Sequence, residues 1–313
     1  MPLSGIDIFK KLPKTNCQDC GVPTCMAFAM KLAAGQAELS ACPHIDDAVR
    51  DELDAASAPP IRCVTIGTGD DALKVGGETV MFRHEKTFVN PPGLGVLVTD
   101  AMADDEIDGK LQRLKTIVYE RVGMHLKADL AALKDTSGDA SSFSALVERV
   151  KQAGITNMIL MSDDAAVMAE GLKAAPGLRP LIYAASADNL QAMADLAKEH
   201  ECPLAVRADG LDDLAELTKQ LADMKINDIV LDSGTRELQQ AFEDQMNIRR
   251  AALKANCREL GYPTIVFPCE MTDDVTQEAL LAATFIPKYA GIIIMSDLNG
   301  ANLFPLTVQR MNI

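Results

Sequence analysis

The chain has 313 residues, of which 48% are hydrophobic and 24% charged, a balance typical of folded globular proteins. Its formal net charge of −15 argues against binding to nucleic acid or to anionic membranes, because both attract basic surfaces. Tryptophan is absent and aromatic residues make up only 4%, so few side chains are available for stacking on single-stranded nucleic acid. We therefore expect a globular protein without nucleic-acid or membrane partners.

The amino terminus has the features of a helix rather than of a targeting signal. The sequence MPLSGIDIFKKLP lacks the apolar centre of a secretory signal peptide, and no apolar segment of the chain is long enough to span a membrane. Ser4 and Asp7 form a helix start of the capping-box type, and Pro13 ends this first helix. These features predict a cytoplasmic protein, in a compartment where thiols stay reduced.

Four of the eight cysteines are concentrated near the amino terminus, in the pattern C-x2-C-x4-C followed after sixteen residues by C-P. They are Cys17, Cys20, Cys25 and Cys42. Two of them are separated by only two residues and followed by Gly21, so that one tight turn can direct both sulfurs toward a single centre. Thr24 is expected to cap a helix that begins at the third cysteine, and the positive end of this helix favours thiolate over thiol.

Four thiolates suit either a zinc ion or an iron–sulfur cluster. Zinc ribbons usually carry two C-x2-C pairs, whereas here the second pair is missing and the third cysteine follows early. The small apolar residues 26–29 would shield a cluster from solvent, and Pro43 follows the last cysteine, as in known cluster-binding sequences. A [4Fe–4S] cluster is the favoured interpretation, and zinc, disulfides and free thiols are the alternatives.

A Ser-Ala-Pro-Pro stretch at residues 57–60 predicts a domain boundary. We assign residues 1–58 to a cluster domain and residues 59–313 to a larger domain. Gly76 and Gly77 separate two β-rich sequences, which predicts a β-hairpin with these glycines at its turn. Strands in this part of the chain would plug or precede the larger domain.

Eight short apolar segments then alternate with stretches whose apolar residues recur at helical spacing. The segments are residues 95–100, 125–133, 157–163, 180–186, 203–209, 228–234, 263–269 and 291–297. Apolar strands that alternate with amphipathic helices indicate a parallel sheet covered by helices. Eight such units predict an α/β protein in which a TIM (β/α)8 barrel is preceded by the small N-terminal [4Fe–4S] domain. An open doubly wound sheet is the alternative, because periodicity does not reveal closure.

Polar side chains follow the predicted strands at their carboxyl ends, where TIM barrels carry their chemistry. They are Thr99, Asp100, Asp135, Ser162, Asp163, Ser186, Arg207, Asp209, Asp232, Ser233, Glu270, Ser296, Asp297 and Asn299. One interpretation is a site for a pterin-like ligand rich in hydrogen-bond donors, and the other is a set of N-caps for the helices that follow. No pair among them stands out as a general acid and base, so none is assigned a catalytic role.

The cysteine pattern, the sequence TIGTG at residues 65–69, the sequence FRHEKTF at residues 82–88 and the eight-unit barrel together carry a family resemblance. The chain resembles the large (gamma) subunit of the corrinoid/iron–sulfur proteins, a family that methanogens use in the acetyl-CoA decarbonylase/synthase complex. The resemblance extends over essentially the whole chain, and the cysteine spacing is its most specific part. By match to the family motif, the cluster ligands are Cys17, Cys20, Cys25 and Cys42.

The resemblance implies a methyl carrier of the anaerobic acetyl-CoA (Wood–Ljungdahl) pathway of carbon fixation. In this family, cobalt(I) of a bound cobalamin accepts a methyl group from methyltetrahydrofolate or tetrahydrosarcinapterin and passes it to nickel of acetyl-CoA synthase. The [4Fe–4S] cluster reductively reactivates cobalt(II). The implied partners are a small subunit, a methyltetrahydrofolate methyltransferase, acetyl-CoA synthase/CO dehydrogenase and a reductive activator. The chain would be a component of a corrinoid-dependent methyltransferase system rather than a stand-alone catalyst.

The family also has a carboxy-terminal corrinoid-binding domain, and this sequence stops at Ile313, before that domain would begin. We therefore expect a piece of a longer protein and assign no cobalamin contacts. Two other functions stay open on the sequence. One is a pterin-dependent barrel methyltransferase with a structural cluster, and the other is an electron carrier of the Rnf type with the barrel as a scaffold.

Overall fold

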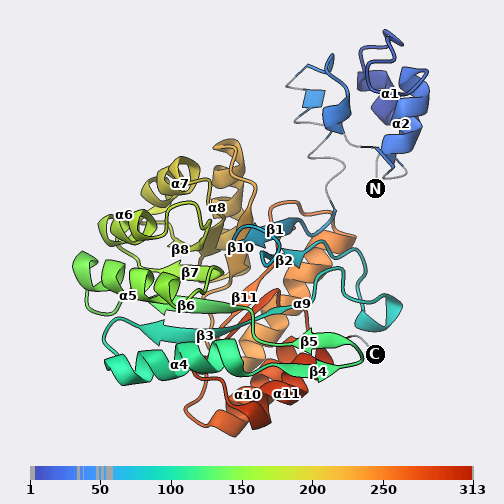
Figure 1. The fold of residues 1–313 in the computed structure, drawn as a ribbon. Coiled ribbons are helices and arrows are strands. Elements are labelled where there is room, and N and C mark those ends of the chain that lie inside the picture. Colours follow the sequence, from blue (N-terminus) through green and yellow to red (C-terminus); the bar gives the residue numbers. More distant parts are fainter. Residues whose placement is uncertain are drawn as a thin grey trace. The chain divides into compact units, whose positions relative to one another are not determined.

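The computed structural model describes residues 4–33, 36–37, 39–46, 49–50, 53 and 59–311. The chain divides into two compact units, Met1–Pro59 and Pro60–Ile313, each with its own apolar core (Figure 1).

The smaller unit contains helix α1 (Gly5–Lys11), helix α2 (Cys25–Ala33) and the 3-10 helix η1 (Leu39–Ala41) (Figure 1). Helix α1 starts as the sequence predicts, because the Ser4 hydroxyl accepts a hydrogen bond from the backbone N–H of Asp7 at 3.3 Å. The core of this unit is formed by Ile8, Leu12, Val22, Cys25, Phe28, Ala29, Leu39, Cys42, Ile45 and Leu53. Two of the four clustered cysteines therefore contribute to the only apolar core that holds this unit's described helices together.

The larger unit is a barrel of eight parallel strands with helices around it (Figure 1). The strands are β3 (Gly93–Thr99), β6 (Leu130–Lys134), β7 (Met158–Met161), β8 (Leu181–Ala185), β9 (Leu204–Arg207), β10 (Ile229–Asp232), β11 (Ile265–Val266) and β12 (Ile292–Met295). They pair in the order β10-β9-β8-β7-β6-β3-β12-β11, and a parallel bridge between Leu231 and Thr264 joins the two ends of this order. The predicted TIM-type barrel is confirmed, and the open sheet is wrong.

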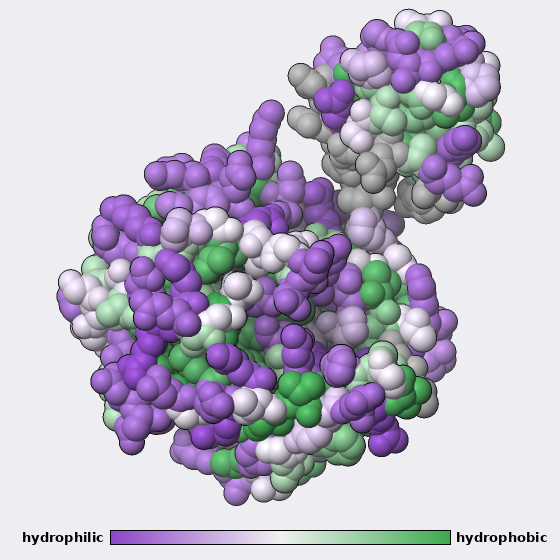
Figure 2. Space-filling view, viewed as in Figure 1, coloured by the Kyte–Doolittle hydropathy of each residue, from purple (hydrophilic) through white to green (hydrophobic). Residues whose placement is uncertain are grey.

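Helices follow the barrel strands and cover their outer side. They are α4 (Asp104–Thr116), α5 (Ala140–Gln152), α6 (Ala165–Ala174), α7 (Leu190–Glu199), α8 (Leu211–Asp223), α9 (Leu238–Lys254), α10 (Val275–Phe285) and α11 (Gly300–Gln309). Strands β7 and β12 are buried at every position, which explains why they read as unbroken apolar segments. The visible face of this unit is mostly hydrophilic (Figure 2), and none of the described helices is both long and apolar enough to cross a membrane.

The second apolar segment, residues 125–133, was predicted as one strand, and this prediction is wrong. Strand β4 (Tyr119–Arg121) pairs with strand β5 (Met124–Leu126) in a separate antiparallel hairpin, and the barrel strand β6 begins only at Leu130. The strands of this hairpin have three residues each and carry charged side chains. They therefore show no alternation of apolar residues from which a strand could be predicted.

A second hairpin, formed by β1 (Cys63–Ile66) and β2 (Leu73–Gly76), precedes the barrel as predicted. The predicted position of its turn is wrong, because Gly76 is the last residue of β2 and Gly77 follows it, so the two glycines do not connect β1 with β2. Gly76 has a φ of 84°, and a Cβ there would lie 2.1 Å from the carbonyl oxygen of Arg62. Glycine is required at this position for close backbone approach rather than for the hairpin turn.

The β1–β2 hairpin plugs the amino-terminal end of the barrel. Val64, Ile66 and Val75 are fully buried and belong to the same apolar cluster as the inward side chains of the strands. Asn157, directly before β7, donates from Nδ2 to the carbonyl oxygen of Asp71 at 2.8 Å and so ties the hairpin to the barrel.

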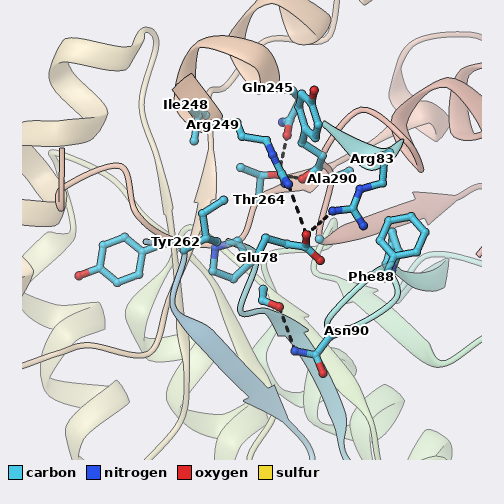
Figure 3. Close-up of a pocket in the computed structure, with 16 residues that line it drawn as sticks. Glu78, Arg83, Phe88, Asn90, Gln245, Ile248, Arg249, Tyr262, Thr264 and Ala290 are labelled. Atoms are coloured by element: carbon cyan, nitrogen blue, oxygen red, sulfur yellow. Dashed lines mark hydrogen bonds and ion pairs between the residues drawn. The ribbon is translucent and has the colours of Figure 1, made fainter. Parts of the chain in front are cut away.

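The segment after this hairpin is fastened to helix α9 through Glu78 (Figure 3). The Glu78 carboxylate accepts hydrogen bonds from Arg83, from the backbone N–H of Val89 at 3.0 Å and from Nη2 of Arg249 at 3.3 Å. Arg83 also stacks on Phe88, with its guanidinium carbon 4.1 Å from the ring centre. The cavity that these residues line has a volume of about 30 Å³, which is room for water rather than for an organic ligand. The FRHEKTF sequence thus contributes to anchoring this segment.

Candidate functional site

The four clustered cysteines lie in two different environments. Cys25 and Cys42 are 7% and 4% exposed, whereas Cys20 is half-buried and Cys17 is exposed. All four are free thiols, with no disulfide among them. The structure therefore offers two sulfurs from the core of the small unit and two from its surface loop.

The loop that carries the first two cysteines has an unusual backbone. Asn16, Gln18 and Gly21 have φ values of 50°, 70° and 74°, so left-handed residues recur along the loop. Alternating handedness of this kind forms the N–H-lined concavities that bind phosphates and iron–sulfur clusters. Asn16 is also fixed to Cys25, because its side-chain oxygen accepts the Cys25 N–H at 2.8 Å and its own N–H donates to Cys25 Sγ at 3.4 Å. An N–H donor at sulfur stabilises thiolate charge.

Thr24 caps helix α2, as predicted from the sequence. Its hydroxyl accepts a hydrogen bond from the backbone N–H of Ala27 at 3.1 Å. Cys25 is the first residue of this helix and lies at its positive end. Helix position and the Asn16 contact both place backbone N–H groups beside the Cys25 sulfur, an arrangement suited to an anionic metal–sulfur centre.

The sulfurs are not spaced as a single metal ion requires. Tetrahedral zinc with Zn–S bonds of about 2.3 Å holds its sulfurs about 3.8 Å apart. Within the described part of the chain, the one group of three metal-ligand side chains whose atoms all lie within 4.8 Å of one another is Cys17, Asp19 and His44. No three of the four cysteines, all of which are described, meet this limit.

Asp19 and His44 lie beside the exposed cysteine of the module. His44 Nε2 donates to Asp19 Oδ2 at 2.6 Å. This hydrogen bond, followed by one from Cys17, holds the pKa of the Asp19 carboxyl below its ordinary value. A carboxylate therefore adds negative charge at the exposed edge of the module. Sequence reasoning missed the pair, because its members are 25 positions apart and form no motif.

The barrel mouth is occupied by an ion-pair network. Arg236 donates to both carboxylate oxygens of Asp232, at 3.1 and 2.9 Å, and to Glu270 at 2.6 Å. Lys134 donates to the other oxygen of Glu270 at 2.6 Å. The hydroxyl of Tyr183 donates to Asp232 and accepts from Arg236 at 3.0 Å. Within this network, each carboxylate already has a cationic partner.

Burial and pairing shift the pKa values in the network in a way that reinforces it. Burial raises the pKa of the Tyr183 hydroxyl well above its ordinary value, and the charge of Asp232 raises it further. Burial alone would raise the pKa of Glu270, but hydrogen bonds from Lys134 and Arg236 outweigh it and hold that pKa below its ordinary value. The phenol stays neutral and the carboxylate stays charged, so neither group is poised as a general acid or base near neutral pH.

Most of the other predicted mouth residues form hydrogen bonds with polar groups of neighbouring loops or of the barrel helices. Asp100 accepts hydrogen bonds from Thr136 and Ser137, and Asp135 accepts one from Ser162 at 2.8 Å. The remaining pairs are Asp163 with Arg207, Ser186 with Asn189, Asp297 with Arg113, Ser296 with Glu278, and Asn299 with the first turn of α11. Thr99, Asp209 and Ser233 lie at strand ends outside the network. Of the fourteen predicted mouth residues, Asn299 alone caps the following helix with its side chain, so the N-cap interpretation is wrong for most of them.

Sequence reasoning named the acidic members of the network and missed the others. Lys134 and Tyr183 lie within apolar strands, and Arg236 lies in the loop after β10. The signals in the sequence were a lysine at the end of one apolar strand and a tyrosine in the middle of another, and the buried partners of these side chains explain both.

Comparisons with known proteins agree with both units. The family described as "CO dehydrogenase/acetyl-CoA synthase delta subunit" matches residues 63–313. The family described as "Putative Fe-S cluster" matches residues 12–44, which contain all four clustered cysteines. Among solved structures, the chain is similar to the dihydropteroate synthase of Yersinia pestis, with a TM-score of 0.50 and 14% identity over 71% of this chain and 92% of that one. This likeness shows the barrel fold alone.

Several characterised relatives match nearly the whole chain. It is 40% identical, over its full length and 70% of the relative, to the corrinoid/iron–sulfur protein large subunit of Moorella thermoacetica. It is 37% identical to the acetyl-CoA decarbonylase/synthase complex subunit gamma of Methanopyrus kandleri, over 98% of this chain and 69% of the relative. For subunit gamma 1 of Methanosarcina thermophila, the identity is 36% over 94% of this chain and 66% of the relative. The chain therefore belongs to the family of corrinoid/iron–sulfur protein large subunits and acetyl-CoA decarbonylase/synthase gamma subunits.

Proposed function

We propose that the chain is the cluster-bearing large subunit of a corrinoid/iron–sulfur methyl carrier. In this proposal residues 1–58 hold a [4Fe–4S] cluster and residues 59–313 form a barrel scaffold. The observation that supports it most strongly is the cysteine module, in which four free thiols, two buried and two near the surface, lie in the segment that matches an Fe–S family.

The proposed ligands are Cys17, Cys20, Cys25 and Cys42. When bound, the cluster supplies the low-potential electron that returns cobalt(II) of the corrinoid to cobalt(I), the form that accepts a methyl group. Cys25 and Cys42 would fix one side of the site in the apolar core, and Asn16 would hold the thiolate of Cys25 through its N–H. Cys17, on the surface, gives the site an edge that a redox partner can approach.

The larger system follows from the names of the relatives, which are subunits of an acetyl-CoA decarbonylase/synthase complex. We propose the small subunit, the methyltetrahydrofolate methyltransferase, acetyl-CoA synthase/CO dehydrogenase and a reductive activator as partners, and the cytoplasm as the location. The methyl donor would be methyltetrahydrofolate or tetrahydrosarcinapterin. Cobalamin is assigned to the complex, and no residue of the barrel is assigned to it.

The structure disfavours the two other functions considered for this sequence. A pterin-dependent barrel methyltransferase needs polar groups free to bind its ligand, but Asp232 and Glu270 are already paired with Arg236 and Lys134. A plain electron carrier of the Rnf type does not account for a family match over residues 63–313.

The proposal is tested by reductive reactivation in the assembled methyl carrier. In a Cys20→Ala variant, assembled with its partners and cobalamin, cobalt(I) prepared with a chemical reductant is expected to accept a methyl group from the methyl donor. After oxidation to cobalt(II), the same variant should fail to recover with the physiological electron donor, while the wild type recovers. Recovery of the variant at the wild-type rate, followed by the cobalt absorption bands, would overturn the proposed role of the module.

A further inference from the structure

The tip of the β4–β5 hairpin has a residue that its local structure does not favour. Val122 and Gly123 form the two-residue turn, with φ values of 52° and 73°. Turns with two positive φ values prefer asparagine, aspartate or glycine at the first position. A β-branched residue in the left-handed region is a steric outlier. Valine therefore destabilises this turn relative to asparagine.

Burial of the Val122 side chain does not offset this destabilisation of the turn. Val122 is 81% exposed, the largest exposure among the large hydrophobic side chains of the described residues. Met124 and Val118, on either side of the same hairpin, are also about two-fifths exposed, at 43% and 42%. Figure 2 shows apolar surface at the lower right of the barrel unit, where Figure 1 draws the tip of this hairpin. An apolar side chain that is strained and exposed has its most direct explanation in a contact with another molecule.

The base of the hairpin is held firmly, so that the tip is presented in a defined position. The Tyr119 hydroxyl donates to the carbonyl oxygen of Gly300 at 2.8 Å. Its ring also packs edge-on against Phe304 of helix α11, with ring centres 5.0 Å apart. Leu126 is buried against the barrel unit. Tertiary contacts thus fix the base of the hairpin on the barrel unit.

A groove with a volume of about 830 Å³ runs beside this hairpin, and we call it the hairpin groove. Met124 forms part of its wall. Its charged lining consists of Lys74, Lys115, Lys127, Arg310, Asp70, Asp71 and Asp129. Lys127 pairs with Asp71 and Arg310 with Asp129, so that Lys74, Lys115 and Asp70 are the lining charges outside these pairs. Among the described residues, neither Lys74 nor Lys115 forms a salt bridge, although the chain as a whole carries a net charge of −15. Unpaired lysines on an acidic protein attract a carboxylate-bearing partner.

We propose that the hairpin groove and the tip of the β4–β5 hairpin dock an acidic segment of a partner subunit, with an apolar residue of the partner against Val122. This inference rests on the proposed function, in which the chain is one subunit of an assembly. The apolar tip would supply the buried contact, and the carboxylates of the partner would pair with Lys74 and Lys115.

Two variants test the docking surface against the small subunit of the corrinoid/iron–sulfur protein, with the full-length chain carrying its cluster. Val122→Asn installs the residue that the turn prefers, so it should raise or maintain the unfolding temperature while weakening binding about tenfold. Lys74→Glu combined with Lys115→Glu should weaken binding by at least about tenfold at low salt and by less at high salt.

Matched controls lie elsewhere on the barrel unit. Leu280→Gln removes an apolar side chain that is 64% exposed on α10, and Lys198→Glu reverses a charge on α7. Both should bind as the wild type does in calorimetric titration.

If the wild type binds the small subunit and the hairpin variants bind equally well, the docking proposal is overturned and the proposed function stands. If the wild type does not bind the small subunit at all, both are overturned. Self-association of the wild type that Val122→Asn abolishes would instead assign the surface to a second copy of this chain and overturn the proposed occupant.

Discussion

The cysteine module and the barrel mouth both contain clustered polar side chains, but the thiols of the module are free, whereas the charged side chains of the network in the mouth are paired with one another. In the module, two thiols lie in a loop with several positive φ values and a third lies at a helix start, and all four are free of disulfides. At the mouth, Arg236 and Lys134 neutralise the two inward carboxylates, Asp232 and Glu270. A TIM barrel normally carries its chemistry at the mouth. In this chain Asp232 and Glu270 are paired within the barrel mouth, and the proposed cluster ligands lie in the small unit.

The largest expected effect comes from the buried thiols of the module. Replacing Cys42 with serine puts a hydroxyl into the apolar core and removes a proposed ligand, so the purified protein should lose most of its iron. Cys63→Ser changes an exposed thiol outside the module and should retain the full iron content. Iron analysis of the two variants makes the comparison, and equal iron in both would contradict the ligand assignment.

Substitutions in the barrel mouth should change the stability of the protein and leave its iron content unchanged. Arg236→Ala leaves Asp232 and Glu270 without their shared partner, and breaking a largely buried network of this kind costs about 3 kcal/mol of unfolding free energy. Lys173→Ala removes an exposed pair with Glu170 on α6 and should leave the unfolding free energy nearly unchanged. Urea unfolding gives both values. A loss of iron in Arg236→Ala with unchanged stability would reverse the roles assigned to the two regions.

The pH dependence of stability tests whether the Glu270 carboxylate is held charged by its partners in the mouth. Its pKa lies below the ordinary value of 4.5 in the folded state, so its charge stabilises the fold above that pH. This contribution is lost as the pH falls through the folded-state pKa. The unfolding free energy of the wild type should therefore drop more steeply on acidification than that of Glu270→Gln, and the difference should be modest because the side chain is a quarter exposed. Parallel curves for the two proteins would show that the carboxylate is not held charged by its partners.

The smallest expected effect concerns the exposed edge of the module. Asp19→Asn removes a negative charge next to Cys17, which should raise the reduction potential of the cluster by less than about 60 mV, a tenfold change in the reduced fraction of a one-electron centre. Asp212→Asn, on the barrel helix α8, should leave the potential unchanged. Redox titration followed by EPR measures both, and a fall in potential for Asp19→Asn would show that the carboxylate does not act through its charge.

The parts of the fold that sequence reasoning predicted are those that local sequence determines. Strands such as β7 and β12 are buried on both faces, and their continuous apolar sequence is sufficient to predict them. The cap at Thr24 depends on a side chain three positions from the N–H that it accepts. The ligand spacing of the module is likewise local, and it gave the candidate site directly.

What the sequence did not reveal depends on contacts between distant positions. The β4–β5 hairpin is too short to show a period, and its stability comes from packing of Tyr119 on α11. Gly76 was taken for a turn residue because its close approach to Arg62 is a tertiary contact. The partners of Glu270 at the mouth lie 136 and 34 positions away along the chain, a separation that no local pattern encodes.

The central claim is tested most directly by metal and sulfide analysis of protein purified without oxygen, together with a low-temperature EPR spectrum after dithionite reduction. The account predicts about four iron and four acid-labile sulfide atoms per chain, with the EPR signal of a reduced [4Fe–4S] cluster. One zinc ion per chain, without iron or sulfide, would contradict it.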